Sequence, residues 1–566
     1  MSNFFRDPGV RETIESIVVA VMLALMFKAF EAEAYIIPTG SMAPTLRGEH
    51  FDIACEQCGH LYQTNCSNKR NDVRNTFCPI CRYRTVLKPE MLSDHNSFDG
   101  DRILVNKFIY DFTEPERWDV IVFKNPRNAK QNYIKRLCGL PNESLLIENG
   151  DLFTFDSRTE SFDERRIARK SPRKIRAMMQ LVDDNKHIGP KLVAANWPLR
   201  WTPIDSKESL PNWTNTNGPD LSYSIDATKS NEIHWLRYRH MVPHIEDWDV
   251  LNGGELPDRI APFALGQTIG GGLVRDHYSY NELVEQKSIE MFTEVSGFHW
   301  VGDLGVEAWV DIQSDTGTLL LETTEGGTHL VCQIDIASGE ASLSSSDSNV
   351  KFVDAKRAGV GQPKGPSKIR GRGKHRVFLM NADDRVFVWI DNRPLVFGGL
   401  TYQDYERTGT AVPTYSEADP GDSLPLGIGC QTAKVQVSRM KVWRDVYYTT
   451  EPFRALPRPE WDYRVNLDIP MLDEILDSPA KWSSEGAAKL FESRKRTEKD
   501  LHQLGEDQFF PMGDNSPASF DTRVWGDPPY VQRDLLLGRA LFLYFPHSLN
   551  RPVYGIPDFS RMKFIR

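Results

Sequence analysis

Cysteine is scarce in this chain, which has eight cysteines among 566 residues. That is too few for a disulfide scaffold of this size. Positive charge is also scarce. The chain has 68 lysines and arginines against 78 aspartates and glutamates, which gives a net charge of −10. An acidic balance argues against a general nucleic-acid binder, so we predict no nucleic-acid partner. The length of the chain predicts about three or four domains instead of a single core.

Long hydrophobic runs are missing as well. The uncharged N-terminal stretch Ser16–Phe27 is about half of the ~20 residues that a membrane-spanning helix needs. A helix continuing over Ile14–Ile37 would span, with its charged side chains near the two interfaces. We predict an uncleaved transmembrane anchor with a cytoplasmic N-terminus, since Arg6 and Arg11 precede it. The alternatives are a signal peptide cleaved near Ala32–Ala34 and a buried core helix.

Histidine is absent from three runs that could carry chemistry. The first run, Ile37–Leu46, places Ser41 a few residues after the apolar stretch; the second, Asn132–Pro141, contains Lys135; the third is Met512–Arg523. A serine hydroxyl is a weak nucleophile and needs a base, which is usually histidine. A lysine can replace it if burial in apolar surroundings lowers the lysine pKa toward neutrality.

Lys135 has suitable neighbours for this role, because Tyr133, Ile134 and Leu137 lie in a strand-like run around it. We predict that Ser41 attacks a carbonyl while neutral Lys135 takes its proton and later gives it to the leaving amine. Taken singly, each run also fits an ordinary turn or loop. The three runs in this order, behind an apolar segment, favour a serine protease with a Ser–Lys dyad.

The order of these runs resembles that of the type I signal peptidases. Between the serine and lysine runs, Gly100–Val105 and Trp118–Phe123 match the strand segments of that family. The resemblance implies an antiparallel β catalytic domain on the outer side of a bacterial inner membrane. It also implies that the substrates are signal peptides of exported preproteins, cut after small residues of the Ala-X-Ala type. It implies no cofactor for catalysis.

The resemblance assigns a role to each candidate site residue. Ser41 would be the nucleophile and Lys135 the general base, and the Ser41 N–H and the Thr39 hydroxyl would stabilise the oxyanion. Ser519 would hydrogen-bond Lys135 and orient it. The supporting residues would be an Asp521–Arg523 ion pair together with Asp514 and Asn515, which shape the turn around the pair.

Five of the eight cysteines lie between residues 55 and 81. Cys55 and Cys58 form one C-x-x-C hook, and Cys78 and Cys81 form another. Two hooks at this spacing are typical of a zinc ribbon, in which four thiolates complete a tetrahedron. We therefore predict a structural zinc ion, with disulfide pairing as the alternative. Cys66 is left over, and His60 could replace one ligand.

The middle of the chain, about 150–505, interrupts the resemblance. Its first part contains the basic run Arg165–Arg176, which fits either contact with anionic head groups or a solvated helix face. Its second part alternates apolar and polar residues, as in Thr328–Ile336 and Arg385–Asp391, which predicts a β-sandwich. This part resembles laminin-G or concanavalin-type jelly rolls, so a glycan or protein ligand or a spacer role is expected. It shows no calcium-ligand cluster and no carboxylate pair at glycosidase spacing.

The sequence predicts a mainly β chain. Its segments would be a cytoplasmic tail and transmembrane anchor (1–34), a first catalytic part with the nucleophile (35–54), a zinc-ribbon-like insertion (55–94), a second catalytic part with the lysine base (95–150), an insertion of unassigned fold (151–295), a laminin-G/concanavalin-like β-sandwich (296–450), a linker with a helix (451–505) and a third catalytic part (506–566).

Two other functions compete with a peptidase. A self-cleaving Ser–Lys regulator of the repressor type would share the dyad, but the apolar N-terminal segment and the absence of a DNA-binding domain count against it. A membrane-anchored binding or docking protein would use the sandwich on an inactive protease scaffold. Such a scaffold should have lost Ser41, Lys135 or Thr39, and all three are present.

Overall fold

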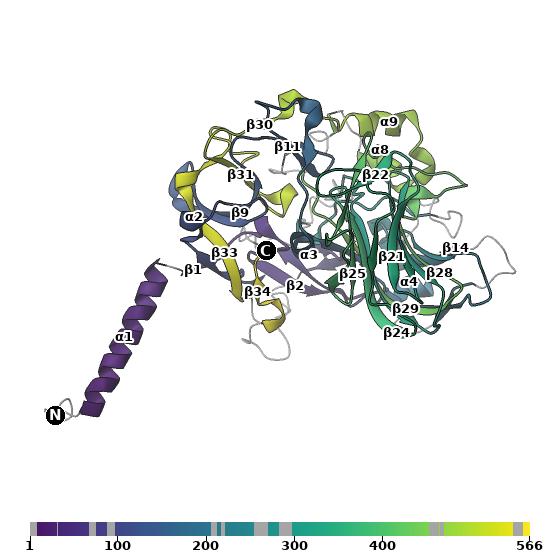
Figure 1. The fold of residues 1–566 in the computed structure, drawn as a ribbon, viewed down its shortest axis with the longest axis horizontal. Coiled ribbons are helices and arrows are strands. Elements are labelled where there is room, and N and C mark those ends of the chain that lie inside the picture. Colours follow the sequence, from purple (N-terminus) through teal and green to yellow (C-terminus); the bar gives the residue numbers. More distant parts are fainter. Residues whose placement is uncertain are drawn as a thin grey trace.

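Strands dominate the chain, as the sequence predicts (Figure 1). The computed structural model describes residues 8–30, 32–66, 75–87, 97–204, 212–216, 221–253, 270–281, 297–451, 463–464, 469–546 and 558–566.

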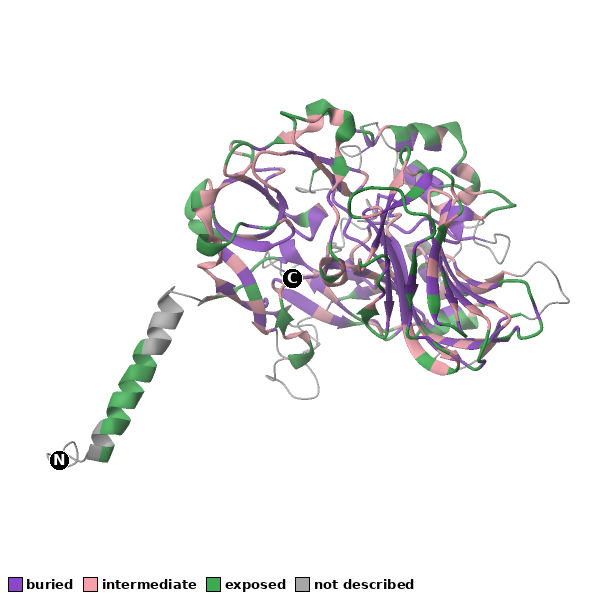
Figure 2. Cartoon of the chain, in the orientation of Figure 1, coloured by how far each residue is buried: buried purple, intermediate pink, exposed green. Residues whose placement is uncertain are grey.

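The N-terminal helix α1 (Pro8–Phe30) projects away from the rest of the chain, and Figure 2 shows its described side chains exposed. The expected continuation of this helix to Ile37 is wrong. Strand β1 (Ala32–Ile36) follows instead, because its backbone pairs antiparallel with β7 (Arg102–Asn106). Within the described ranges, no helix is long and apolar enough to span a membrane, so the predicted transmembrane helix is not supported.

An eight-stranded sheet joins the two ends of the chain. In hydrogen-bonded order its strands are β1, β7, β33 (Leu536–Phe545), β8 (Val120–Asn125), β9 (Asn128–Gly139), β31 (Gln508–Met512) and β32 (Val531–Gln532), with β34 (Lys563–Phe564) on β33. All of its strand pairs are antiparallel. Because β31 returns beside β9, everything between them is an insertion into one sheet.

Apolar side chains cover both faces of this sheet. On β8, Val120 and Val122 join one core cluster, whereas Ile121 and Phe123 join another. Successive side chains of a strand point to opposite faces, so β8 is a central strand buried on both sides. The neighbouring strand β9 is therefore held rigidly from both faces.

Smaller sheets flank the eight-stranded sheet. A four-stranded sheet contains β12 (Arg166–Ile167), β11 (Asp151–Phe155), β10 (Ser144–Glu148) and β30 (His502–Gln503). A three-stranded sheet contains β3 (Leu61–Asn65), β2 (His50–Ala54) and β6 (Ser97–Phe98). A two-stranded sheet contains β4 (Asn75–Phe77) and β5 (Arg84–Val86). A short helix, α2 (Ile109–Phe112), follows β7.

Two large sheets form the inserted domain. The ten-stranded sheet contains β15 (Thr214–Thr216), β16 (Ser222–Asp226), β29 (Lys434–Arg444), β18 (Leu304–Ile312), β24 (Gly373–Ala382), β25 (Arg385–Ile390), β27 (Gln403–Arg407) and β22 (Val350–Val353), with β13 (Gln180–Asp184) on β29 and β26 (Arg393–Pro394) on β25. The seven-stranded sheet contains β14 (Trp201–Ile204), β17 (His234–Tyr238), β28 (Leu426–Gln431), β19 (Thr318–Glu325), β20 (Thr328–Asp335), β21 (Glu340–Ser345) and β23 (Lys364–Pro366).

One hydrophobic core lies between these two sheets. Val306 and Val310 of β18 and Leu319 and Leu321 of β19 belong to the same buried cluster, which makes the domain a β-sandwich. Strands from 180–238, a region to which the sequence assigns no fold, extend both sheets. The partners of β13, β16 and β17 lie some two hundred residues or more later, as in the pairing of Tyr223 with Val437, and local pattern cannot reveal such pairings.

The basic run holds the sandwich in place, unlike either interpretation made from the sequence. The Lys170 Nζ lies 2.6 Å from Asp383 and 2.7 Å from Asp445, and all three side chains are buried. Helix α3 (Pro172–Met178) begins at the N-cap Ser171 and buries Ile175 against aromatic side chains of the ten-stranded sheet. The run therefore lies at an internal interface.

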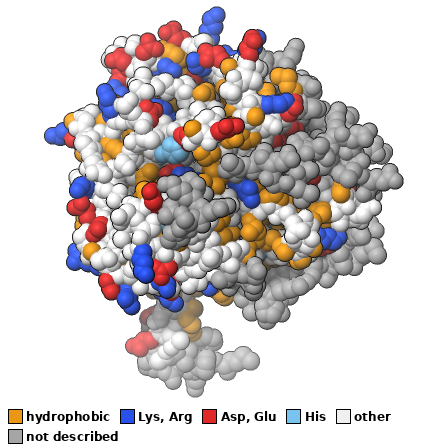
Figure 3. All heavy atoms as spheres, turned by 90° about the vertical axis from the view of Figure 1, so that its right-hand side faces the viewer, with side chains coloured by type: hydrophobic (Ala, Val, Ile, Leu, Met, Phe, Trp, Pro, Cys, Tyr) orange, Lys and Arg blue, Asp and Glu red, His pale blue; other side chains and the backbone are white. Residues whose placement is uncertain are grey.

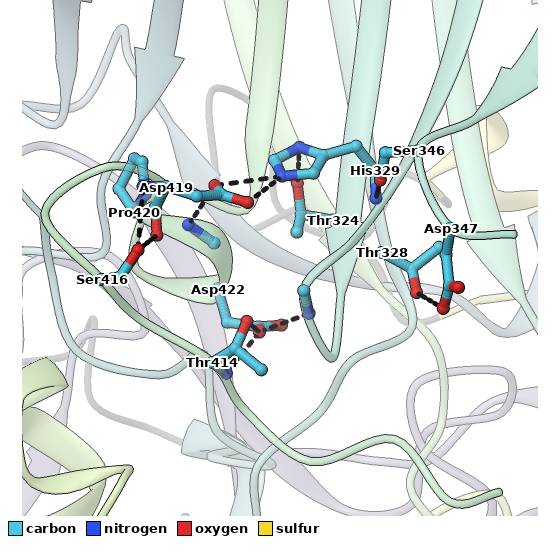
Figure 4. A network of polar contacts seen from close by, with 12 residues as sticks. Thr324, Thr328, His329, Ser346, Asp347, Thr414, Ser416, Asp419, Pro420 and Asp422 are labelled. Atoms are coloured by element: carbon cyan, nitrogen blue, oxygen red, sulfur yellow. Dashed lines mark hydrogen bonds and ion pairs between the residues drawn. The ribbon is translucent and has the colours of Figure 1, made fainter. Parts of the chain in front are cut away.

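A loop from 414 to 422 is tied to the β19–β20 turn, as Figure 4 shows. The carboxylate of Asp422 accepts hydrogen bonds from the backbone N–H groups of Gly326 and Gly327 at 2.9 and 3.0 Å. The Nε2 of His329 lies 3.1 Å from both carboxylate oxygens of Asp419. These contacts fix one end of the sandwich.

Four more helices complete the described fold: α4 (Pro190–Ala194), α5 (Ile245–Leu251), α8 (Ile469–Asp477) and α9 (Glu485–Glu492). Helix α9 begins at Ser484, whose side chain accepts from the Ala487 N–H, and so provides a helix in the predicted linker. On the face that Figure 3 shows, acidic and basic side chains are interspersed and hydrophobic side chains gather between them.

Candidate active site

Ser41 lies in a short 3-10 turn, Gly40–Met42, directly after β1. Two hydrogen bonds hold this turn to the C-terminal part of the chain. The Asn515 N–H donates to the Ser41 carbonyl at 3.1 Å, and the Asn515 side-chain amide donates to the Gly40 carbonyl at 3.1 Å. Asn515 was predicted to shape the turn around Asp521 and Arg523, and these bonds tie it to the turn that carries Ser41.

Lys135 lies on β9, beside Ile121 of β8. Its Nζ is 2.5 Å from the Ser41 Oγ, and both side chains are buried. Burial in this site lowers the pKa of Lys135 to about 8, although the carboxylates of Asp521 and Asp514 oppose that shift. A lysine with this pKa is neutral in a large fraction of molecules near pH 8 and can accept a proton.

The predicted ion pair between Asp521 and Arg523 is present. The Arg523 Nε and Nη2 donate to the two Asp521 oxygens at 2.9 and 2.7 Å. Burial alone would raise the pKa of Asp521, but the Arg523 guanidinium holds it below its usual value. Since Asp521 also accepts from the Gly513 N–H at 3.0 Å, the pair fixes the turn that follows β31.

Asp514 has a role that the sequence did not reveal. Its carboxylate accepts from the Nε and Nη2 of Arg136 at 2.5 and 2.6 Å and from the Thr45 hydroxyl at 2.5 Å. Arg136 and Asp514 are fully buried. The sequence assigns no role to Arg136, and a bidentate partner in a distant run carries no sequence signal.

Ser519 differs from its predicted role. It is buried, but its Oγ makes no hydrogen bond to Lys135 and has no partner within the described part of the chain. The physical reason is its position over the loop backbone, since a Cβ placed on Gly513 would lie 2.3 Å from that oxygen. The Lys135 Nζ points to Ser41 instead.

Thr39 lies two residues before Ser41, in extended backbone at the start of the 3-10 turn. Its side chain is exposed and makes no capping hydrogen bond to that turn.

The inserted domain reaches the site as well. The side-chain amides of Asn281 and Asn515 pair, with N–O distances of 2.7 Å in both directions. On the other side, the Thr449 N–H donates to the Ser516 Oγ at 2.9 Å, and its carbonyl accepts from Arg523 at 2.7 Å. Sequence reasoning missed these contacts because neither Asn281 nor Thr449 lies in a recognisable motif.

Two groups of described residues have the donor types of a metal site. The sulfur atoms of Cys55, Cys58, Cys78 and Cys81 lie within 4.8 Å of one another, as do carboxylate oxygens of Asp151, Asp303 and Asp383. The second group was not expected, because its members come from three separate segments.

In the second group, burial raises the pKa of both Asp151 and Asp303 well above the usual value. The ammonium group of Lys170 lies beside Asp383 and balances part of the charge.

Comparisons with known proteins agree with this geometry. Residues 84–194 and 465–545 match the family described as Signal peptidase, peptidase S26. Lys135, Asp514 and Asp521 lie inside these ranges, and Ser41 precedes them. Solved structures matched by shape include the carbohydrate-binding module CBM66 from Bacillus subtilis, at 9% identity, 44% of this chain, 92% of that chain and a TM-score of 0.19, which is too low to support a fold assignment.

The curated relatives described next are all named as signal peptidases. Signal peptidase I of Leptolyngbya laminosa is 28% identical over 25% of this chain and 49% of its own length. Probable signal peptidase I-1 of Synechocystis sp. is 25% identical over 25% of this chain and 51% of its own length. Signal peptidase I P of Bacillus subtilis subsp. natto is 24% identical over 27% of this chain and 55% of its own length. The chain spans about half the length of these relatives, and two parts of it match the signal peptidase family, peptidase S26.

Proposed function

We propose that this chain is a serine endopeptidase that removes N-terminal signal peptides from exported preproteins, with Ser41 as nucleophile and Lys135 as general base. The observation that carries the proposal is the 2.5 Å contact between the Lys135 Nζ and the Ser41 Oγ. A buried lysine whose pKa lies near 8 supplies the base that the three candidate runs otherwise lack.

The chemistry follows from these two groups. The Ser41 Oγ bonds to the carbonyl carbon of the scissile peptide while its proton passes to the Lys135 Nζ. When the tetrahedral intermediate collapses, the C–N bond breaks and the Nζ returns that proton to the leaving amine. Water then attacks the acyl-enzyme, with the Nζ taking a proton from the water and returning it to the Ser41 Oγ as the acid leaves.

The developing oxyanion needs donors that are already in place. We assign this role to the Ser41 N–H and the Thr39 hydroxyl. The Ser41 N–H makes no hydrogen bond to other described residues, and the Thr39 side chain is exposed beside it. Asn515 fixes the turn that carries both groups, so their positions do not depend on the substrate.

The substrate class is inferred from the relatives, whose printed names are signal peptidases. We propose cleavage after small residues of the Ala-X-Ala type. The test is cleavage of a preprotein with such a site by the full chain, comparing wild type with Ser41→Ala and Lys135→Ala. We expect each variant to lose at least about a thousandfold in kcat/KM, because the dyad acts as a unit.

A matched control is Lys124→Ala, which removes an exposed lysine from the neighbouring strand β8 and should leave the rate unchanged. Circular dichroism and thermal unfolding of each variant establish that it is folded. Equal cleavage by wild type and by both dyad variants would refute the assignment of Ser41 and Lys135. Cleavage at bonds without small residues would refute the proposed specificity.

We further propose that the enzyme works at a bilayer surface, where signal peptides are presented. Its support is the row of exposed apolar side chains on α1, which include Ile17, Val18, Val19, Val21 and Met22. Co-sedimentation with phosphatidylglycerol vesicles tests this, with Val18→Glu/Met22→Glu as the comparison. Binding that is unchanged in this variant would exclude α1 as the membrane contact.

A further inference from the structure

The two C-x-x-C hooks lie in matching turns. Cys55 and Cys58 lie in the turn between β2 and β3, and Cys78 and Cys81 lie in the turn between β4 and β5. In each turn the first cysteine accepts a backbone hydrogen bond, from the N–H of Gly59 or of Arg82, at 2.9 Å.

Those two donors have positive φ angles of 69° and 57°. For Arg82 this is a conformation that a side chain disfavours, so the turn is held there by its surroundings.

The sulfur atoms lie at the separation that a tetrahedral metal requires. The Sγ atoms of Cys55 and Cys81 are 3.5 Å apart, and those of Cys58 and Cys78 are 3.6 Å apart. A disulfide bond would bring a pair to about 2.05 Å. Zinc with Zn–S bonds of ~2.3 Å places its ligands about 3.8 Å apart.

All four cysteines are buried, so the site is closed as in a structural zinc centre. The remaining cysteine of the segment, Cys66, is buried nearby but is not one of the four.

The inserted domain contacts the backbone of both hooks. The Trp248 indole N–H donates to the Cys81 carbonyl at 2.7 Å, and the Arg200 Nη2 donates to the Ile80 carbonyl at 2.5 Å. The His187 Nδ1 lies 2.9 Å from the Cys58 carbonyl. Each of these carbonyls belongs to a turn that the cysteines shape.

Apolar contacts support these hydrogen bonds. Leu192 and Trp248 are buried in the same cluster as the four cysteines, and Trp197 and Leu251 pack against it. The hooks alone form small sheets of two and three strands, which are too small to bury a core. Their position therefore depends on the metal site and on this interface together.

We propose that the four cysteines bind a zinc ion that fastens the small inserted segment to the sandwich domain through His187, Arg200 and Trp248. Binding releases the thiol protons to solvent and involves no oxidation. The metal fixes the two hooks, the hooks present the carbonyls of Cys58, Ile80 and Cys81, and the sandwich domain recognises those carbonyls. Removing the metal therefore loosens an interface that lies outside the metal-binding segment itself.

A cavity of about 1020 Å³ lies at this interface, lined by Cys81 and by side chains that include Trp197, Arg200, Trp201 and Tyr223. Its wall thus combines one metal ligand with residues of the sandwich domain. The cavity keeps its shape only while both sides are held, so zinc occupancy controls it.

The first test measures metal in the full chain purified under reducing conditions. We expect one equivalent of zinc by atomic emission, and the intense visible bands of a tetrahedral cobalt thiolate after exchange with Co²⁺. Cys58→Ser and Cys78→Ser should each lose the zinc, whereas Cys66→Ser is the matched control and should keep it. A purified chain with no zinc and with disulfides between these cysteines would overturn the proposal.

The second test measures amide hydrogen exchange in wild type before and after zinc is removed by a chelator. We expect exchange around Arg200 and Trp248 to accelerate at least about tenfold, and exchange in β24 and β25 to stay unchanged.

Faster exchange confined to the hooks would retain a zinc site but overturn the fastening role. Neither readout uses peptidase activity, so this proposal and the proposed function can fail independently.

Discussion

At the scale of single residues, Lys135 shows how one environment sets a function. It is buried beside Ser41 on a strand that both faces of the sheet hold in place. Burial disfavours the ammonium form, and the nearby Asp521 carboxylate is already engaged by Arg523. The Asp521–Arg523 ion pair therefore weakens the tendency of the Asp521 carboxylate to raise the pKa of Lys135. The lysine then loses its proton near pH 8.

This environment predicts the pH dependence of cleavage. The protonated ammonium cannot accept the Ser41 proton, so kcat/KM should rise about tenfold per pH unit below a midpoint near 8 and level off above it. Initial rates with an Ala-X-Ala preprotein between pH 5.5 and 9.5 measure this. Lys124→Ala should keep the same midpoint. A midpoint close to the ordinary lysine value of 10.5 would contradict the role of burial.

Sequence could identify Ser41 and Lys135 because unusual residue types stand in runs of recognisable order. It also identified the four cysteines, because ligand spacing within each hook is local. It could not identify Arg136 as the partner of Asp514, since that contact joins residues 378 positions apart. The predicted bond from Ser519 to Lys135 failed for a related reason, because the direction of a hydroxyl depends on three-dimensional packing.

At the scale of elements, the β19–β20 hairpin carries a charge network. The Nδ1 of His329 lies 2.9 Å from Glu322, and its Nε2 faces Asp419. Burial alone would lower the pKa of His329, but these two carboxylates raise it to about 9. Arg237 also pairs with Glu322, so the hairpin is joined to β17 as well.

The network predicts how stability changes with pH. The folded pKa of His329 is about 9 and the ordinary value is 6.5, so its stabilisation is complete below pH 6.5 and is lost as pH rises through 9. Allowing for solvent screening, we expect the loss to be on the order of 1–2 kcal/mol. Thermal unfolding at pH 6 and pH 9.5 measures it.

His329→Gln should weaken this dependence on pH, whereas His375→Gln, a histidine of the other sheet, is the matched control. A variant His329→Gln with the full wild-type pH dependence would show that other groups cause it.

Strands lie where the sequence predicts them when the alternation of apolar and polar residues is strong. Strands β20 and β25 lie where alternation predicts them. The segment after α1 did not follow the sequence, because β1 gains a backbone partner in β7 and this tertiary pairing outweighs continuation of the helix. Strands β13 to β17 carried no readable signal, since each is short and β13, β16 and β17 find partners far along the chain.

At the scale of the whole molecule, the inserted domain and the active site are one structure. The insertion leaves the eight-stranded sheet after β9 and returns at β31, and two residues inside it contact the loop that follows β31. Thr449 binds both Ser516 and Arg523, and Asn281 binds Asn515. The inserted domain therefore contacts the loop that holds the turn carrying Ser41.

Asn281 tests this connection most directly. Its amide pairs with the Asn515 amide, which in turn donates to the Gly40 carbonyl beside the nucleophile. Losing one hydrogen bond of about 1 kcal/mol at this distance should lower kcat about three- to tenfold in Asn281→Ala. KM and the unfolding temperature should change little, because the Asn281 side chain is only half-buried and acts on the turn through Asn515.

The matched control for that prediction is Asn349→Ala, which removes an exposed asparagine of the sandwich far from the catalytic loop in sequence. It should retain the wild-type kcat. If Asn281→Ala lowered kcat only in proportion to a loss of folded protein, its effect would be on stability. If kcat stayed at the wild-type value, the turn carrying Ser41 would be held by the Asn515 backbone bond alone, and the insertion would have no hold on catalysis through this residue.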